Sequence, residues 1–235
     1  MIRRHFDNRQ NWLDAKNAIG KNMLTTASEA SIRLGINPWK TIDYLYNVKT
    51  GLVPPEDISG KACVQFGIDA EAPIRELVKL DFPQFRIDWH PYDILVMDSY
   101  PFIGATLDGE ITASNNELGV LEAKTGSFRG PKDLVPWDDG HIPMHYFAQV
   151  VHQLMVTGYS FALVAARLKR DPYRETDNGL PEVVWRYAMI RATDQGVRES
   201  IPIVLKSCIS LHSCVLSGTR PNLSVKCSIG GLYGR

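Results

Sequence analysis

The sequence predicts an α/β fold in which a central mixed sheet, begun by an antiparallel meander, is flanked by helices. The middle of the chain, 85–124, holds short alternating or apolar runs that are typical of strands. An amphipathic run at 143–158 follows them and is typical of a helix. Two further runs, 159–168 and 182–190, are apolar enough to lie inside a mixed sheet.

The composition is that of a globular chain long enough for one sizeable domain. Hydrophobic residues make up 44% and charged residues 22% of the 235 residues, which excludes a disordered chain. The formal net charge is zero, which argues against a simple basic nucleic-acid coat protein. A chain of this charge that binds DNA must gather its Lys and Arg side chains on one face, or concentrate them by assembly.

Targeting and redox signals predict a cytoplasmic protein. No apolar run approaches the ~18 residues of a membrane span. The N-terminus, MIRRHFD, lacks the apolar core of a secretory signal. The four cysteines, at irregular spacing, fit reduced thiols better than a disulfide framework.

Helices are expected near both ends of the chain and on either side of the meander. Thr26 or Ser28 can cap a short helix that Gly35 ends. Pro73 should kink a longer helix near Asp69, or limit its start to about that point. The expected helices are 26–35, 41–50, 58–80, 143–158 and 194–217.

The strands expected ahead of the amphipathic helix form an antiparallel meander. They are 85–89, 94–97, 102–111 and 118–124. Beyond them, 126–140 is expected to be a loop, and the Gly- and Ser-rich tail after 217 is expected to be loose.

The hairpin 102–126 gathers residues that suit one kind of chemistry. Asp108 ends its first strand, while Glu122 and Lys124 lie two apart on its second and therefore face the same side. The turn at 113–117 is rich in turn residues, and strand pairing would set Asp108 beside the second strand. Two carboxylates and an ammonium then converge, and hard oxygen ligands of this kind suit Mg²⁺ or Mn²⁺.

The spacing Asp–(13 residues)–Glu–x–Lys resembles the core of the PD-(D/E)xK, or restriction-endonuclease-like, nucleases. A lone E-x-K occurs by chance on many solvated strands, so the surrounding motifs matter more. G-A-T-L-D-G around Asp108, L-E-A-K-T-G around Glu122 and P-x-x-Y-x-x-Q on the following helix together resemble the lambda exonuclease-like, or YqaJ-like, viral recombinase family. The resemblance extends from about Trp12 to Thr157.

This resemblance implies a Mg²⁺-dependent DNA exonuclease, with Mn²⁺ as a substitute, that digests one strand of duplex DNA from its 5′ end in phage-type recombination. Lys124 would orient the attacking water, and Gln149 would position water or the neighbouring carboxylates. Taken alone, Glu71 could equally be a solvent-facing helix carboxylate. The groups that the resemblance places at the metal are Glu71, Asp108, Glu122 and the carbonyl of Ala123.

In the N-terminal part the resemblance implies a site for the terminal phosphate of DNA. Ser28 matches the family's serine, whereas Lys16 occupies the position of an arginine, which keeps the charge but loses the bidentate fork. Arg33 could add charge there, and Tyr146 of the helix motif is a further candidate DNA contact. A plain helix cap is the alternative role for Ser28.

One departure from the family pattern lies on the same helix as Gln149. Where relatives often carry a second Gln, this chain has Val151, which removes one expected polar contact. His152 or Gln153 could substitute, although both are expected at the surface.

The length is that of one domain, so we expect a single nuclease domain over 1–235, made of an N-terminal DNA-end-binding part (1–57), a catalytic core (58–190) and a C-terminal helix and tail (191–235) that the resemblance does not reach. The partners that the resemblance implies are double-stranded DNA, a single-strand annealing protein and further copies of the chain, for example in a ring. Two other interpretations stay open: a structure-specific or single-strand endonuclease, and a catalytically idle member of the fold that binds DNA or protein. The intact D…E-x-K argues against the idle member.

The cysteines need a separate interpretation, because some relatives of this core hold an Fe–S cluster on one early and three late cysteines. The late cysteines are spaced more widely here than in typical cluster sites, and Cys208 falls on an apolar helical seam. We therefore expect structural thiols and no cluster. The four residues are Cys63, Cys208, Cys214 and Cys227.

Overall fold

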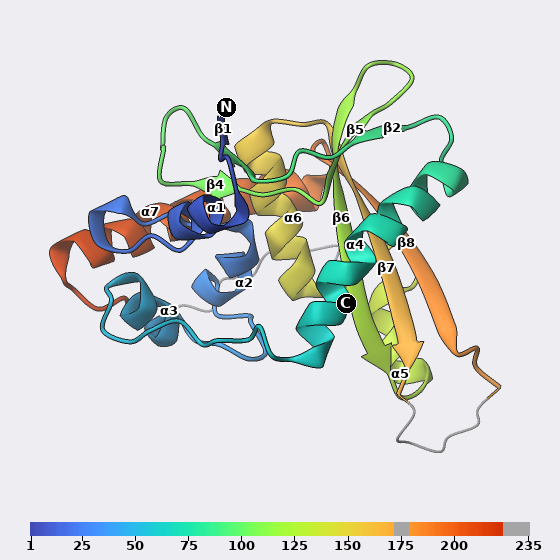
Figure 1. The fold of residues 1–235 in the computed structure, drawn as a ribbon, viewed down its shortest axis with the longest axis horizontal. Coiled ribbons are helices and arrows are strands. Elements are labelled where there is room, and N and C mark those ends of the chain that lie inside the picture. Colours follow the sequence, from blue (N-terminus) through green and yellow to red (C-terminus); the bar gives the residue numbers. More distant parts are fainter. Residues whose placement is uncertain (172–178, 223–235) are drawn as a thin grey trace.

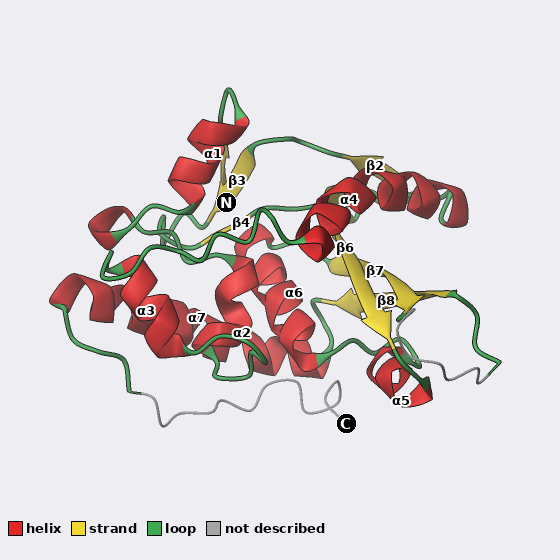
Figure 2. Ribbon diagram, turned by 60° about the horizontal axis from the view of Figure 1, so that its bottom comes forward, coloured by secondary structure: helices red, strands yellow, loops and turns green. Residues whose placement is uncertain are grey.

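The computed structural model describes residues 1–171 and 179–222, and over these residues it confirms the expected α/β fold (Figure 1). A mixed sheet lies on one side of the molecule, and the helices of the N-terminal part gather with the last helix on the other (Figure 2). Most of the Gly- and Ser-rich tail, including Cys227, lies outside the described residues.

The central sheet has the strand order β2-β5-β6-β7-β8. The pair β6–β7 is parallel and the other pairs are antiparallel, so the predicted mixed sheet is confirmed. β5 and β6 form the predicted hairpin, with Gly109 opposite Leu121. The strands are β2 (Arg86–Asp88), β5 (Gly109–Thr112), β6 (Leu118–Phe128), β7 (Phe161–Arg170) and β8 (Val183–Arg191).

A second, three-stranded sheet shows that the predicted meander is wrong in part. The expected strand 102–111 is divided: its two halves, β4 and β5, pair in different sheets, and Asp108 lies immediately before β5. The alternation of polar and apolar residues within one segment does not reveal this division, because it does not specify which other strand the segment pairs with. β1 was not expected, since all four of its residues are exposed and it has no apolar pattern. The strands, in the order β1-β3-β4, are β1 (Ile2–His5), β3 (Asp93–Val96) and β4 (Gly104–Ala105).

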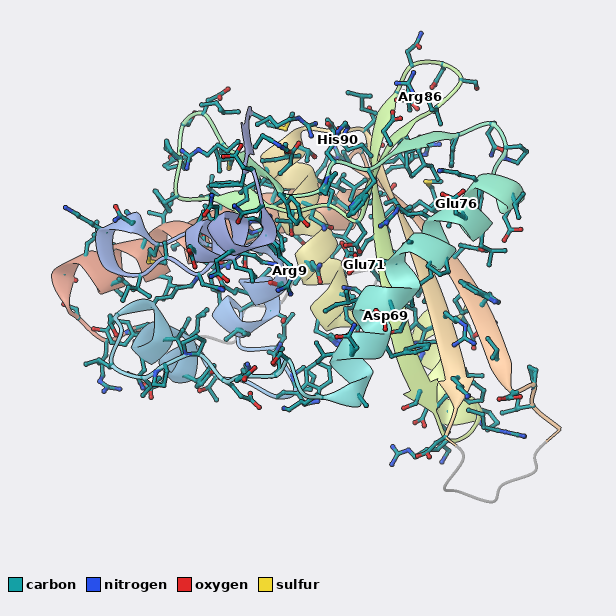
Figure 3. The ribbon with its side chains drawn as sticks, in the orientation of Figure 1. Arg9, Asp69, Glu71, Glu76, Arg86 and His90 are labelled. Atoms are coloured by element: carbon teal, nitrogen blue, oxygen red, sulfur yellow. The ribbon has the colours of Figure 1, made fainter. Side chains whose placement is uncertain are left out.

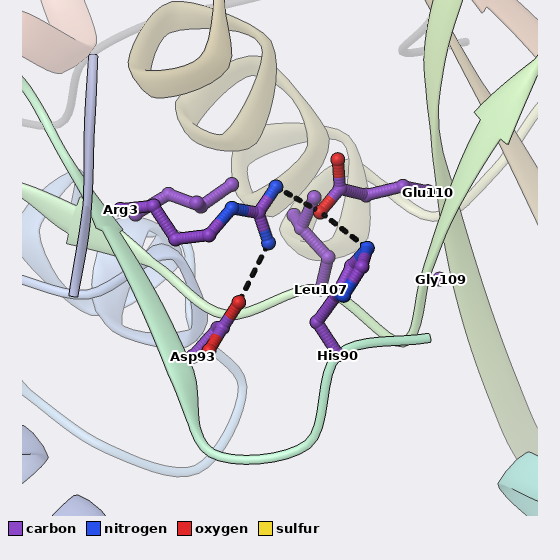
Figure 4. A pocket seen from close by; sticks show the side chains of 7 residues that line it. Arg3, His90, Asp93, Leu107, Gly109 and Glu110 are labelled. Atoms are coloured by element: carbon purple, nitrogen blue, oxygen red, sulfur yellow. Dashed lines mark hydrogen bonds and ion pairs between the residues drawn. The ribbon is translucent and has the colours of Figure 1, made fainter. Parts of the chain in front are cut away.

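Arg3 joins the two sheets (Figure 4). Its guanidinium donates to Asp93 Oδ2 on β3 at 2.7 Å and to Glu110 Oε1 on β5 at 2.5 Å. Tyr159 donates its hydroxyl proton to the other oxygen of Glu110 at 2.6 Å. Burial, and then this carboxylate, raise the pKa of Tyr159. Because Glu110 lies two residues after Asp108, these contacts hold the start of β5 in place.

The helices predicted from periodicity are present, with altered ends. α6 (Met144–Thr157) confirms the predicted helix 143–158, and Gly158 ends it at φ 69°. α7 (Gln195–Ser217) ends in the same way at Gly218. The other α-helices are α1 (Arg9–Lys16), α2 (Ala30–Arg33), α3 (Ile42–Lys49), α4 (Ala62–Asp81) and α5 (Pro131–Leu134).

Two predictions about helix and loop limits are wrong. α4 runs through Pro73, so the alternative in which the helix begins near Asp69 is wrong, while the alternative of a kink stays a prediction. Pro73 has no N–H to bond the carbonyl of Asp69, four residues earlier. Both residues are exposed, so water can bond this carbonyl instead. The expected loop 126–140 has regular structure over most of its length, because β6 continues to Phe128 and α5 and the 3₁₀-helix η3 (Val135–Trp137) follow.

Different helices cover the two faces of the central sheet. Leu121 of β6 packs in a core cluster with α4, whereas its neighbour Val120 packs in another cluster with α6 and α7. Successive side chains of a strand point to opposite faces. Glu122 and Lys124 therefore lie on the same side of β6 as Val120, the side covered by α6.

α7 is long and apolar enough to cross a membrane by length and composition, with a mean hydropathy of 1.4 over an 18-residue window. One such helix is weak evidence for a membrane span, because the core helix of a folded domain passes the same test. Here its seam, which includes Val204 and Cys208, packs into the core.

A buried polar network ties α2 and α6 to β4. Arg33 donates to His152 Nδ1 at 2.8 Å and to the carbonyl of Thr26 at 3.0 Å. Because arginine can only donate, Nδ1 accepts and Nε2 carries the proton that is donated to the Gly104 carbonyl at 3.0 Å. Burial, and then the charge of Arg33, hold the pKa of His152 well below its ordinary value. His152 is thus a neutral core residue, and the prediction that it lies at the surface is wrong.

The network leads to a pH-dependent stability prediction for His152→Leu. At pH 8 the variant should lose about 1–3 kcal/mol of the free energy of unfolding, because Arg33 keeps a buried donor without an acceptor. Below the ordinary histidine pKa of 6.5, the unfolded wild type binds a proton that the folded state excludes, so wild-type stability falls as the pH drops. The difference between the two proteins should shrink by about 2 kcal/mol between pH 8 and pH 5 in urea titrations. A difference that does not change with pH would contradict a neutral His152.

Candidate active site

Asp108 lies beside β6 as expected, although it comes just before β5 and does not end the first strand of the hairpin. Asp108 Oδ2 accepts a hydrogen bond from the backbone N–H of Ala123 at 2.8 Å, which holds the carboxylate against β6. Glu122 and Lys124 flank Ala123, and Lys124 Nζ donates to Glu122 Oε1 at 2.5 Å. The structure therefore brings the two carboxylates and the ammonium together.

Two glutamines of α6 hold the carboxylate of Glu122, whose residue is only 3% exposed. Gln149 donates its amide to Oε1 of Glu122 at 2.6 Å and accepts a bond from Lys124 Nζ at 3.0 Å. Gln153 donates to Oε2 of Glu122 at 2.5 Å. Both oxygens of the buried carboxylate are thus bonded, and Gln149 bridges the glutamate to the lysine.

Gln153, which the sequence offered only as a substitute for the missing second glutamine, lies in the site. It was expected at the surface, yet it is 0% exposed. Its spacing agrees with this position, since residues four apart share one side of a helix and Gln149 lies four residues earlier. Its Oε1 has no hydrogen-bond partner among the described residues, but a flipped amide would set this oxygen against Glu122. Gln153 therefore supplies a donor that the buried, apolar Val151 cannot.

Like charges crowd around Asp108. Burial raises the pKa of Asp108 well above its ordinary value, and Glu122 and Glu71 raise it further. Glu71 lies on α4 (Figure 3). Burial raises the pKa of Glu71, the charge of Arg75 lowers it, and the charge of Glu122 raises it again. Burial also lowers the pKa of Lys124, but Glu122 and Asp108 together outweigh it, so the pKa lies above its usual value. Lys124 is therefore cationic at neutral pH.

The donor set around Asp108 fits a small, hard cation. Within the described residues, no three His, Cys, Asp or Glu side chains are grouped so that they could hold a metal by themselves. A cation at Asp108 and Glu122 would need the Ala123 carbonyl and water to complete its shell, which suits Mg²⁺ because it keeps several waters. Its charge would offset the carboxylate repulsion that raises the pKa of Asp108.

Tyr146 packs beside the ammonium from α6. Lys124 Nζ lies 4.7 Å from the centre of its ring, within the range of a cation–π contact. Burial raises the pKa of the Tyr146 hydroxyl, although the charge of Lys124 lowers it, so the ring stays neutral.

Lys16 ends α1 and feels the negative charge of several carboxylates of the site. Burial lowers the pKa of Lys16, and the charges of Glu29, Asp108 and Glu71 partly offset this effect. Its Nζ also lies 4.6 Å from the centre of the Trp12 ring. The structure therefore brings Lys16 into the electrostatic neighbourhood of Asp108.

Ser28 and Arg33 are placed very differently from each other. Ser28 is exposed on the 3₁₀-helix η2 (Ala27–Glu29), with its Oγ 3.2 Å from Thr26 Oγ1. The cap is Thr26, through a capping box with Glu29, so a plain cap is not the role of Ser28. Arg33 is buried and bonded to Thr26 and His152, so its guanidinium does not face a phosphate site.

The described cysteines are free thiols on two helices. Cys63 is exposed on α4, Cys208 is buried on α7, and Cys214 is half-buried on α7. The expectation that the protein carries no Fe–S cluster stays a prediction.

A mixed sheet in which Asp108 lies against a strand that carries Glu122 and Lys124 matches the architecture expected for the PD-(D/E)xK class. Within that class, the chain belongs to the family described as the YqaJ-like viral recombinase domain, whose model matches residues 11–160. The resemblance that the motifs predicted is confirmed.

Two comparisons define how far this likeness extends. The uncharacterized protein YqaJ of Bacillus subtilis (strain 168) is 33% identical over 151 residues, which cover 64% of this chain and 43% of that protein. The chain thus spans less than half the length of this relative. The crystal structure of an alkaline exonuclease (LHK-Exo) from Laribacter hongkongensis has a TM-score of 0.59 at 13% identity, covering 89% of this chain and 95% of that chain. Its complex with dAMP gives a TM-score of 0.58 at 14% identity over the same shares. At these identities the structural likeness shows the fold alone.

Proposed function

We propose that this chain is a Mg²⁺-dependent DNA exonuclease that degrades one strand of linear duplex DNA from its 5′ end. The observation that carries the proposal is the bond from the Ala123 N–H to Asp108, which sets one carboxylate beside Glu122 and Lys124. The viral recombinase family supports it, as does the shared fold with a structure described as an alkaline exonuclease and also known with dAMP. Action in phage-type recombination, a cytoplasmic setting, an annealing partner and assembly into an oligomer are parts of the same proposal.

The carboxylates and the glutamines have separate tasks in this proposal. Bound Mg²⁺ would lower the pKa of a water and offset charge on the phosphate. Gln149 and Gln153 hold both oxygens of Glu122, so the carboxylate keeps one orientation. The groups that would hold the ion are Asp108, Glu122 and the Ala123 carbonyl, with Glu71 assisting.

Lys124 supplies positive charge from the chain itself. Its Nζ is bonded to Glu122 and Gln149 and lies over the ring of Tyr146, so it is held at one place. A fixed ammonium can orient the attacking water and stabilise the negative charge that develops on the phosphate.

Lys16 and Ser28 are proposed to bind the terminal 5′ phosphate. The Ser28 side chain is exposed, and the carboxylates beside which the scissile phosphate would lie act on the charge of Lys16. Arg33 is left out of this proposal because its donors are used inside the protein.

Digestion of end-labelled duplex DNA with and without Mg²⁺ tests the proposed activity. Linear duplex should lose nucleotides from its 5′ ends, and closed circular DNA should stay intact, because the proposed phosphate site needs an end. A 5′-phosphorylated duplex should be digested faster than a 5′-hydroxyl duplex, and Ser28→Ala with Lys16→Ala should reduce that preference. Cleavage of circular DNA would indicate an endonuclease. DNA binding without any cleavage would indicate that the chain is a catalytically idle, DNA-binding member of the fold.

Asp108→Asn and Lys124→Ala should both slow digestion strongly but for different reasons. Asp108→Asn removes a proposed metal ligand, so Mn²⁺ binding measured by calorimetry should weaken with the rate. Lys124→Ala leaves the ligands in place, so Mn²⁺ binding should persist while the rate falls by about 10²–10³-fold. Normal digestion by Lys124→Ala would show that Lys124 takes no part in the reaction.

Gln153→Leu should weaken Mn²⁺ binding and the rate by about 10–100-fold, the range found when a residue that orients a metal ligand is changed. The physical reason is that Glu122 Oε2 loses its donor and the carboxylate can turn. Gln195→Leu is the matched control, since Gln195 is exposed on α7. Equal Mn²⁺ affinity in the two variants would show that Gln153 does not position Glu122.

A further inference from the structure

Trp39 is an exposed aromatic residue on a turn that the structure holds in place. Its residue is 72% exposed, more than that of any other Trp or Phe among the described residues. Asn37 Oδ1 accepts bonds from the backbone N–H groups of Trp39 at 2.9 Å and of Lys40 at 2.8 Å. The amide of Asn37 also donates to Ser31 Oγ at 2.8 Å, which ties the turn to α2. The indole is therefore presented to solvent from a fixed position.

Rings connect Trp39 to the ammonium of the active site. The Trp39 and His145 rings meet edge to face, with centroids 5.3 Å apart. His145 in turn contacts the ring of Tyr146 with centroids 4.0 Å apart, and Lys124 Nζ lies over that ring. Trp39, His145 and Tyr146, which we call the aromatic shelf, thus lead outward from Lys124.

The aromatic shelf carries no charge at neutral pH. Burial, and then the charge of Lys124, lower the pKa of His145 to about 4, so its ring is neutral. A phosphate gains no charge attraction from such a surface. A nucleobase can stack on this surface, because every base has a π face. Such stacking on an aromatic side chain depends little on the base sequence.

The ammonium of Lys124 and the aromatic shelf together suit one nucleotide, with its phosphate at Lys124 and its base on the shelf. In the proposed function Lys124 faces the scissile phosphate, and the neutral aromatic shelf begins directly beside it. Bases inside a duplex already have both faces stacked, so only a terminal or unpaired base has a face to offer. A stacking surface beside the phosphate site therefore favours a DNA end over a continuous duplex.

We propose that Trp39 is a base-stacking subsite for the terminal or unpaired nucleotide next to the scissile phosphate. The proposal rests on the proposed nuclease function for the identity of its ligand. It adds a contact that recognises the base of a DNA end, separate from the Lys16 and Ser28 contacts to the phosphate.

DNA binding in the presence of chelator tests the subsite without any cleavage. The probes are fluorescein-labelled short duplexes with either a normal nucleotide or an abasic residue at the first, second or third position from the end. Trp39→Ala should bind the normal end about 5- to 100-fold more weakly than wild type in fluorescence anisotropy. Trp39→Phe should lose no more than a few-fold, because a phenyl ring still stacks.

The abasic probes distinguish stacking from a structural role. On the duplex whose abasic residue faces the aromatic shelf, wild type and Trp39→Ala should bind equally well, because no base is present to stack. Leu80→Ala is the control, since Leu80 is 76% exposed at the far end of α4. Wild-type affinity of Trp39→Ala for the normal end, or the same loss on every abasic probe, would overturn the subsite. Failure of the wild type to digest DNA in Mg²⁺ would instead overturn the proposed function.

Discussion

The buried charge of Glu122 is the constraint on which the rest of the site depends. A carboxylate removed from water is costly unless charged or hydrogen-bonding partners surround it. One partner, Lys124, comes from the same strand, while Gln149 and Gln153 come from α6. These bonds fix the position of α6 along β6, because both glutamines must reach the carboxylate of Glu122. The apolar residues of α6 pack on that same face of the sheet. Core packing and polar contacts select the same position for the helix.

Asp108 is held by other means, because it lies between strands of two different sheets. Its carboxylate accepts a hydrogen bond from the N–H of Ala123, and its carbonyl accepts one from Arg75 at 3.0 Å. Two residues further on, Arg3 donates to the carboxylate of Glu110. These contacts keep a carboxylate close to like charges that would otherwise push it away. The fold thus maintains a repulsion that a bound cation would relieve.

Several cations of the N-terminal part are used inside the protein. Lys49 pairs with Glu29 at 2.7 Å and donates to the carbonyl of Leu24 at 2.8 Å, and Arg33 is enclosed by bonds to backbone and histidine. Net charge counts such internal cations together with those at the surface, so the value of zero does not show how much positive charge is free to meet DNA. In the functions proposed for this chain, recognition depends on a few placed groups, among them Lys124, and not on a broad basic surface.

The sequence by itself determined the features that depend on one segment of chain. The apolar stripe predicted α6, the turn residues predicted the hairpin, and the two-residue period set Glu122 and Lys124 on one side of β6. The tertiary structure alone decided that 94–97 pairs in a second sheet and that Gln153 and His152 are buried. Periodicity describes how a single segment is patterned, whereas strand pairing and burial depend on which other segments cover it. A polar side chain on α6 therefore looks solvent-facing in the sequence until β4, β6 and α2 close over it.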